Sequence, residues 1–484
     1  MEHISKTVFL NYLKCPTLGW KTKRAVFPKF SGLDNELLNL ESRNIHKAAL
    51  KLFPDAVNWK VVKAAKHDAA YKNLFAGLDT GKAVYAVSFT ADGFYAKPDI
   101  LKKLENNSWH LFGIKSGNRC KVKYVNDISF DAMVLSKLGI KVSIASILYL
   151  SDNYRIGIES SKAFNEADCS EKVKLKAQEF SSIASDVLKG VENDVMPEPS
   201  LKRCCKNCTV FYDCIGKGVK NHIFDLPRLS ILQMDELVKM CADTIDKIPD
   251  DFELSESQKI AKNCVLANSR YISTDLKDRL DAIKFPFYYL DFEFMTTIMP
   301  LYPNIAPRTH ILTQFSLDKT DKYGNILDHY EYIADQTRDC RKDIAEKLIE
   351  YLDGTGSIVT YADAERAIIS ELAVMFPELS DPLNKIVKRI VDLELIIKEC
   401  YYDINFRGKT SMKKILPVLI PDMNYDSLTI HRGSDASAAF AFMAMGMYDE
   451  NKITETKNNL LKYCAQDTLA MIYVHQFLIN VVVK

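Results

Sequence analysis

The chain has 484 residues, and its charges almost cancel, because 64 lysines and arginines stand against 63 aspartates and glutamates. Hydrophobic residues make up 47% of the chain and charged residues 26%, as in an ordinary globular protein. This length exceeds what one hydrophobic core holds, so two or three domains are expected. With a formal charge of +1, no overall field draws the protein to nucleic acid, and any such binding must come from local patches.

No apolar run is long enough to span a membrane, and the first six residues lack the apolar core of a signal peptide. The chain has 12 cysteines, which in a protein of this size and charge indicates a reducing compartment rather than a disulfide scaffold. We therefore expect a cytoplasmic protein with no membrane partner.

Sequence patterns divide the chain into three segments and predict the α/β class. Residues 1–220 mix helical and strand-like patterns and end in a cysteine cluster. Residues 221–283 are predicted to be a helical connector between two domains. Residues 284–484 begin with an acidic strand and end with a helix, and we expect them to form the second α/β domain.

The cysteines of the first segment have a spacing that is typical of a metal cluster. Cys205, Cys208 and Cys214 form a Cys-x2-Cys-x5-Cys motif, and Cys15 lies far upstream, near the start of the chain. Zinc sites commonly use two Cys-x2-Cys pairs or a histidine pair. One distant cysteine and a trio fit a four-thiolate iron–sulfur cluster better, with Cys204 as an alternative to its neighbour Cys205.

This arrangement resembles the iron–sulfur RecB-type nucleases of the PD-(D/E)XK superfamily, which include the CRISPR-adaptation exonucleases. The resemblance implies a [4Fe–4S] cluster that fastens the N-terminus onto the cysteine trio. It assigns His46, on a helix, and Asp99 to a metal ion, and Asp99 and Lys115 to catalysis. Lys115 belongs to the strand that carries Glu-x-Lys in the family, but Gly113 stands in place of the glutamate.

The missing glutamate bears on the activity of the first domain, because the family uses this carboxylate as a metal ligand. We expect an N-terminal centre with reduced or lost activity that binds nucleic acid. The alternative is that Asp127 or Asp131, on the following helix, supplies the carboxylate instead.

The third segment contains the acidic residues that a two-metal exonuclease requires. Asp291 and Glu293 share one face of an apolar strand, because side chains repeat every two residues. Tyr463 and Asp467 share one face of a helix at i, i+4. Carboxylates gathered in an apolar setting repel one another unless divalent cations lie between them. Two ions about 3.5–4 Å apart can stabilise the attacking and leaving oxygens of a phosphodiester.

A third acid is expected where a buried strand over residues 357–361 leads into a helix. Glu365 is the preferred residue, and Asp363 is the alternative, although Asp363 also fits a helix cap. Asp392 is a further acid in an apolar context, with a cap or a buried hydrogen-bonded group as the competing interpretation. The basic segment 408–414 could contact phosphates, although solvated lysines are the ordinary case.

Residues 284–484 resemble the DnaQ-like exonucleases of the RNase H-like fold, in the subgroup whose last motif is Tyr-x-x-x-Asp. The resemblance assigns Asp291, Glu293, Glu365 and Asp467 to two Mg²⁺ or Mn²⁺ ions. It makes Tyr463 the residue that orients the attacking water. The family usually has aspartate in the second motif, so Glu365 is a departure.

The whole chain resembles a bacterial family in which a RecB-type iron–sulfur nuclease domain precedes a DnaQ-like exonuclease domain. Motifs that carry this resemblance include residues 289–293, 413–417 and 463–468. We expect a metal-dependent 3′→5′ exonuclease on DNA, with the N-terminal domain holding or threading the strand. The alternatives are an RNA exonuclease and a non-catalytic iron–sulfur DNA-binding subunit of a repair or phage-defence assembly.

Overall fold

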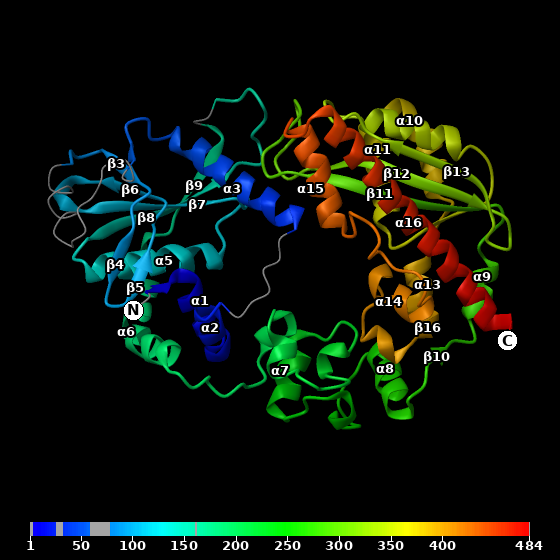
Figure 1. Ribbon diagram of the computed structural model, residues 1–484, viewed down its shortest axis with the longest axis horizontal. Coiled ribbons are helices and arrows are strands. Elements are labelled where there is room, and N and C mark those ends of the chain that lie inside the picture. Colours follow the sequence, from blue (N-terminus) through cyan, green and yellow to red (C-terminus); the bar gives the residue numbers. More distant parts are fainter. Residues whose placement is uncertain (1–2, 26–31, 59–77, 160–161, 484) are drawn as a thin grey trace.

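The computed structural model describes residues 3–25, 32–58, 78–159 and 162–483. The fold is mixed α/β and contains two large sheets, each packed against helices, with a largely helical segment between them. Figure 1 shows the six-stranded sheet on the left, the five-stranded sheet on the right, and helices α7 and α8 below them.

The N-terminal sheet has the strand order β2-β3-β6-β7-β8-β9. Its strands are β2 (Val57–Asn58), β3 (Ala83–Tyr85), β6 (Ile100–Lys103), β7 (Trp109–Lys115), β8 (Val142–Leu150) and β9 (Phe164–Asp168). Strand β7 runs antiparallel to β6 and parallel to β8. Parallel neighbours need a crossover, and α5 (Val122–Lys137) supplies it. Its apolar side packs on the sheet, where Leu111, Ile128 and Ile147 share one core.

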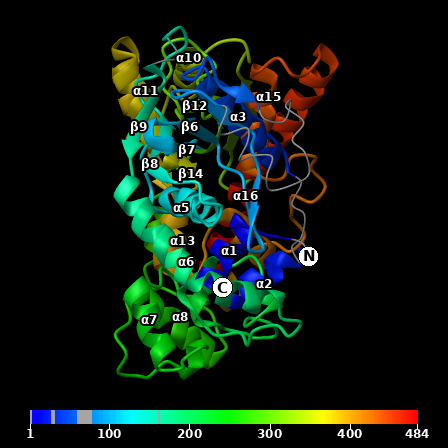
Figure 2. The ribbon, with the colours of Figure 1, turned by 90° about the vertical axis from the view of Figure 1, so that its left-hand side faces the viewer.

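The other elements of this half include three helices that precede the sheet. They are α1 (Lys6–Lys14), α2 (Pro16–Lys23) and α3 (Leu33–Leu50), and a small sheet joins β1 (Ile4–Ser5), β5 (Phe94–Ala96) and β4 (Phe89–Ala91). The long helix α6 (Ser170–Glu192) packs against α5 and leads to the cysteine segment. Figures 1 and 2 both place α3 between this half and α15 (Gly433–Ala444) of the other half.

The connecting segment is helical and packs against the C-terminal half. It contains α7 (Ile231–Lys239), α8 (Glu256–Ala267), α9 (Leu276–Asp281) and a short strand β10 (Tyr271–Ile272). Capping boxes begin α7 and α8, because Ser230 and Ser255 each exchange hydrogen bonds with a glutamine three residues later. Strand β10 pairs with β16 (Tyr401–Tyr402), and Ile245 and Leu280 belong to the same core as Leu478.

The C-terminal sheet has the order β13-β12-β11-β14-β15. Its strands are β11 (Phe287–Thr296), β12 (His310–Thr320), β13 (Ile326–Ile333), β14 (Ser357–Thr360) and β15 (Ile390–Asp392). The first three are antiparallel, and β14 and β15 run parallel to β11. The expected strand at 357–361 is thus present as β14, and helix α10 (Arg341–Tyr351) precedes it.

Helices cover both faces of this sheet. Tyr288, Leu290 and Phe292 pack toward α10 and α11 (Ala364–Met375). The alternate residues of β11, beginning with Tyr289, face α16 (Glu450–Val483), which crosses β11 and β12. Helix α12 (Ser380–Val387) packs beside α10 and α11, whereas α13 (Leu393–Cys400), α14 (Met412–Leu419) and α15 share the core of the α16 face. Within the described chain, no helix has the length and apolarity needed to cross a bilayer.

Candidate metal centre

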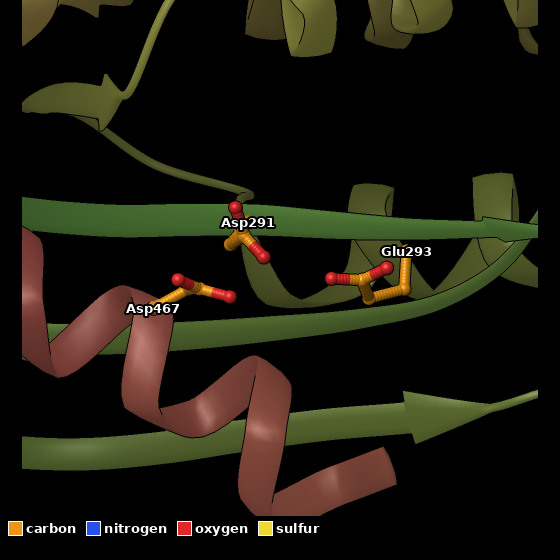
Figure 3. A group of neighbouring side chains, drawn as sticks. All are labelled: Asp291, Glu293 and Asp467. Carbon is orange, nitrogen blue, oxygen red and sulfur yellow. The ribbon is translucent and has the colours of Figure 1, made fainter. Parts of the chain in front are cut away.

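Three carboxylates meet where α16 crosses β11. Asp291, Glu293 and Asp467 each offer an oxygen that lies within 4.8 Å of the other two. Figure 3 shows the two strand carboxylates and the helix carboxylate pointing toward one another. All three side chains are partly exposed, so solvent and small ions can reach them. Of the side-chain groups in the described residues, this is the one whose geometry suits a shared cation.

The position of Asp467 depends on polar contacts that fasten α16 to the sheet. Gln314 Nε2 donates to Leu460 O at 2.9 Å, and Thr468 Oγ1 donates to Asp318 Oδ2 at 2.6 Å. Further along, Tyr289 Oη and His475 Nδ1 lie 2.7 Å apart. These contacts are buried, where an unpaired polar group would be costly. They hold the helix in one register, which sets Asp467 above Asp291.

Segment 412–425 braces the two motif residues of α16. Lys413 Nζ donates to Tyr463 Oη at 2.7 Å and to His431 O at 2.8 Å. Tyr425 Oη donates to Asp467 Oδ1 at 2.5 Å. Because Tyr463 Oη accepts from lysine, its own hydroxyl hydrogen can be donated, and Asp467 also takes a hydrogen bond from Tyr463. The basic segment noted in the sequence thus contributes one lysine to this centre.

Burial and mutual repulsion favour the protonated acids in this cluster. Burial, with the charges of Asp467 and Glu293, raises the pKa of Asp291 well above its usual value. Burial and the charge of Asp467 raise the pKa of Glu293 to about 8. Burial raises the pKa of Asp467 to about 6, although Tyr425 and Lys413 oppose the shift. A bound cation reverses this preference, because it favours the ionised carboxylates.

Glu365 lies near the trio without belonging to it. It is in the first turn of α11, it is buried, and its Oε2 has no hydrogen-bond partner. Burial raises the pKa of Glu365 to about 8. The alternative residue Asp363 pairs with Arg366 at 2.7 Å. Asp392 caps α13 and accepts from Leu395 N, as the competing interpretation expected.

The N-terminal centre differs, because each of its acids already has a partner. His46 Nε2 lies 3.1 Å from Asp99 Oδ1, and Ile114 N donates to Asp99 Oδ2 at 2.8 Å. Lys115 Nζ donates to Asp127 Oδ2 at 3.0 Å. Burial disfavours the charged form of Asp99, but His46 and Lys115 hold the pKa of Asp99 below its usual value. His46, Asp99 and Lys115 line a cavity of about 200 Å³.

The place of the missing glutamate is filled by an apolar side chain. A Cβ on Gly113 would lie 2.5 Å from Ile128 Cγ2, which is closer than real atoms approach. Asp131 is buried, and its Oδ2 accepts from Lys6 Nζ at 2.6 Å. Asp127 is engaged by Lys115. In the described parts of the chain, no three possible ligands of this centre come within 4.8 Å of one another.

The cysteines singled out in the sequence converge on one small cavity beside α2. Its lining includes Cys15, Cys204, Cys205, Cys208 and Cys214. Burial raises the pKa of Cys205 to about 11, and it also raises the pKa of Cys204 and Cys214. These thiols therefore ionise at neutral pH only beside a metal. Four sulfurs around one zinc ion would lie about 3.8 Å apart. No three of the described sulfurs lie within 4.8 Å of one another, so their spacing is wider than one zinc ion requires.

Comparison with known families adds one domain match. A family model described as "Domain of unknown function (DUF2779)" matches residues 288–411. That range includes Asp291, Glu293 and Glu365 and ends before Lys413, Tyr463 and Asp467.

Two curated proteins are similar to part of the chain. One, named "Uncharacterized protein MG366 homolog" and found in Mycoplasma pneumoniae, is 25% identical over 209 residues, which are 39% of this chain and 32% of that protein. The other, "Uncharacterized protein MG366" of Mycoplasma genitalium, is 22% identical over 234 residues, or 44% of this chain and 35% of that protein. The matched part thus spans about a third of the length of these relatives.

Sequence reasoning missed the residues that act on the motif residues from elsewhere in the chain. Tyr425 belongs to no recognisable motif, yet it holds Asp467. Cys464 lies inside the Tyr-x-x-x-Asp motif, and its Sγ is 3.5 Å from Asp291 Oδ2. Lys413 did carry a signal in the sequence, because it follows a hydroxyl-rich segment and lies in the first turn of an apolar helix.

Proposed function

We propose that this chain is a metal-dependent exonuclease whose catalytic centre is the acid cluster of the C-terminal half. The observation that carries the proposal is the convergence of Asp291, Glu293 and Asp467 within 4.8 Å. The five-stranded sheet, with three antiparallel and two parallel strands, also supports an RNase H-like domain. DNA, cut from the 3′ end, is the substrate that the resemblance to DnaQ-like enzymes favours.

The donor set fits divalent magnesium or manganese. Hard cations of this kind prefer carboxylate oxygens, and four such side chains are present. The unpartnered Oε2 of Glu365 supports the fit, because a buried oxygen without a partner is costly unless something binds it. When bound, the ions would stabilise the charge on the attacking and leaving oxygens of a phosphodiester.

The protein's own groups orient the reactants. Burial and nearby carboxylates raise the pKa of Tyr463 far above its usual value, so its hydroxyl stays protonated at neutral pH. It therefore positions a water or a phosphate oxygen by hydrogen bonding and does not act as a base. Lys413 fixes the direction of that hydroxyl and places a positive charge beside the reacting phosphate.

A digestion assay tests the proposal. End-labelled single-stranded DNA, double-stranded DNA and RNA are each incubated with the protein in Mg²⁺ or Mn²⁺, and with EDTA as the control. We expect shortening of DNA from its 3′ end that requires the metal. Preferential shortening of RNA would support the RNA exonuclease instead. Binding without digestion of any polymer would favour the non-catalytic subunit.

We further propose that the N-terminal half binds nucleic acid, that its nuclease centre is degenerate, and that Cys15, Cys205, Cys208 and Cys214 hold a [4Fe–4S] cluster. Protein purified without oxygen should then be brown, with broad absorbance near about 400 nm. Trp20 lies in α2, the helix that begins directly after Cys15. Loss of the cluster should therefore change tryptophan emission. Exonuclease activity should survive that loss, since the acid cluster lies in the other half. A colourless protein with one stoichiometric zinc ion contradicts this assignment.

A further inference from the structure

Helix α3 links the two candidate centres at its opposite ends. At its start, Asp34 interacts with Arg432 Nη2 at 3.4 Å, and its backbone N–H donates to Asp435 Oδ1 at 3.3 Å. Arg432 precedes Gly433, whose added Cβ would lie 3.9 Å from both Glu293 Oε2 and Tyr463 Oη. The first turn of α3 therefore adjoins the rim of the acid cluster.

The far end of α3 forms a wall of the N-terminal cavity. Ser42 and His46 line that cavity together with Asp99 and Lys115. His46 follows Asp34 by twelve positions, so the helix rises about 18 Å between these two residues. A single strand of a few nucleotides covers such a distance, since one oligonucleotide-binding domain takes about 4–16 nucleotides.

The loop that follows β11 locks this helix in place. Glu41 is buried on α3, and its carboxylate accepts from Ile298 N at 2.5 Å. From the same loop, Arg308 donates to Ser116 O at 3.1 Å and to Asp152 Oδ1 at 2.5 Å. Ser116 follows Lys115 directly. The two halves thus contact each other through α3 and this loop, and these contacts set the separation of the two centres.

The outward face of α3 carries groups that suit a polynucleotide. Asn39, Ser42, Arg43 and Lys47 are exposed, His46 is partly exposed, and one exposed acid, Glu36, lies in the first turn of the helix. Asn39, Ser42 and His46 follow one another at helical spacing and form a stripe that ends in the cavity. Amide and hydroxyl groups, together with arginine and lysine, make most protein contacts to phosphates. A protein partner would bury large apolar side chains. Among the described residues of this face, Leu38 is the one exposed large apolar side chain.

We infer that the exposed face of α3, defined by Asn39, Ser42, Arg43, His46 and Lys47, is the path of a single-stranded nucleic acid. One end of the strand enters the acid cluster while an upstream segment lies in the N-terminal cavity. The inference rests on the proposed exonuclease function and names how its substrate is held. The path follows a single helix face, so we expect it to hold a single strand better than a duplex.

Binding measurements on the full chain test the path. Fluorescent oligothymidylates of 4 and 20 nucleotides are titrated in EDTA, so that no digestion occurs, and anisotropy reports the Kd. Asn39→Asp with Arg43→Glu adds negative charge along the path and should weaken binding of the 20-mer about tenfold. In the same variant, the affinity for the 20-mer relative to that for the 4-mer should also fall. Lys259→Glu is the matched control, because it reverses an exposed charge on α8, away from both centres.

The outcomes separate this inference from the proposed function. Suppose that the wild-type protein digests DNA and that the α3 variant binds the 20-mer as tightly as the Lys259→Glu control. This result overturns the path but leaves the proposed exonuclease function intact. Weakened binding by the α3 variant, in a protein that digests nothing, supports the path alone. The path is also overturned if the wild-type protein binds no single strand, or if a blunt duplex loses affinity to the same extent. Circular dichroism melting of each variant confirms that the exposed substitutions leave the fold intact.

Discussion

The acid cluster of the C-terminal half and the cavity of the N-terminal half use similar residues in opposite ways. In the acid cluster, the three carboxylates face one another, and burial and repulsion raise their pKa values. In the N-terminal cavity, Asp99 is held by His46 and a backbone N–H, and Asp127 is held by Lys115. Carboxylates that face one another favour an external cation, which offsets their repulsion, whereas the charges of carboxylates paired with histidine or lysine are already balanced.

The comparison shows why the presence of acids is a weaker sign of a metal site than their state of pairing. Asp291 lies within strand β11 and Asp99 directly precedes strand β6, and each half has further acids nearby. The glycine at position 113 permits Ile128 to fill the space that a carboxylate would need. Four experiments can break or sharpen this contrast.

The largest effect is expected at the acid cluster. Asp291→Asn or Asp467→Asn removes a carboxylate charge, and we expect metal-dependent digestion to fall on the order of a thousandfold. Initial rates on a labelled strand in Mn²⁺ measure the loss. Asp186→Asn, on the exposed side of α6, is the matched control and should digest at the wild-type rate. Wild-type digestion by Asp291→Asn would show that this cluster is not the catalytic centre.

The next effect concerns the bracing of Tyr463. Lys413→Met removes both the hydrogen bond to Tyr463 Oη and a positive charge, and kcat should fall about a hundredfold. Tyr463→Phe should be milder, about tenfold, because one hydrogen bond is lost and no charge. Lys413→Arg keeps the charge and should recover part of the rate. Equal losses in Lys413→Met and Lys413→Arg would indicate a packing role for the lysine.

A smaller effect should appear as a pH dependence of stability. The pKa of Glu293 is about 8 and that of Asp467 about 6, both above the unfolded values of about 4. The metal-free folded protein therefore holds more protons than the unfolded chain between these values, and its stability falls as pH rises through that window. Mn²⁺ displaces these protons, so its stabilisation should grow with pH. Thermal melts in EDTA and in Mn²⁺ at about pH 5.5, 7 and 8.5 measure both trends.

That pH trend has its own control. The double substitution Glu293→Gln with Asp467→Asn removes two of the titrating groups, so the fall in stability between about pH 5.5 and 8.5 should be shallower in EDTA. A slope that stays unchanged in this variant would place the responsible groups elsewhere in the chain.

The smallest effect is expected at Gly113, and it tests the N-terminal half. On backbone grounds alone a strand position tolerates glutamate better than glycine, but here an added Cβ would lie 2.5 Å from Ile128 Cγ2. Gly113→Glu should lower the free energy of unfolding by about 1–3 kcal/mol through overpacking. Adding Ile128→Ala should relieve part of the strain. In an Asp291→Asn background, new Mn²⁺-dependent cleavage by that double variant would show that the missing carboxylate alone silences this centre.

Much of the local structure could be predicted from sequence patterns. Strand β11 with its acids on one face, strand β14, helix α10 and the helical connector all follow from periodicity and capping signals. Periodicity works here because each pattern spans a few neighbouring residues and is reinforced by burial of one face. It also anticipated that Asp392 could be a cap.

Contacts between distant segments escaped such reasoning. Tyr425 reaches Asp467 across 42 positions, and Glu41 reaches the Ile298 backbone across 257. Neither residue lies in a pattern that marks it, since a single tyrosine or glutamate has many ordinary uses. The occupation of the Gly113 site by Ile128 likewise depends on how α5 lies on the sheet.

The sequence by itself determined which residue types are available for chemistry and which faces of strands and helices they share. It brought Asp291 to the same face as Glu293, Tyr463 to the same face as Asp467, and the cysteines to a recognisable spacing. Only the tertiary structure decided that α16 crosses β11 so that the acids converge, that the N-terminal acids are paired, and that α3 joins both centres. The physical reason is range, because local periodicity follows from backbone geometry, whereas the pairing of charges depends on which surfaces pack together.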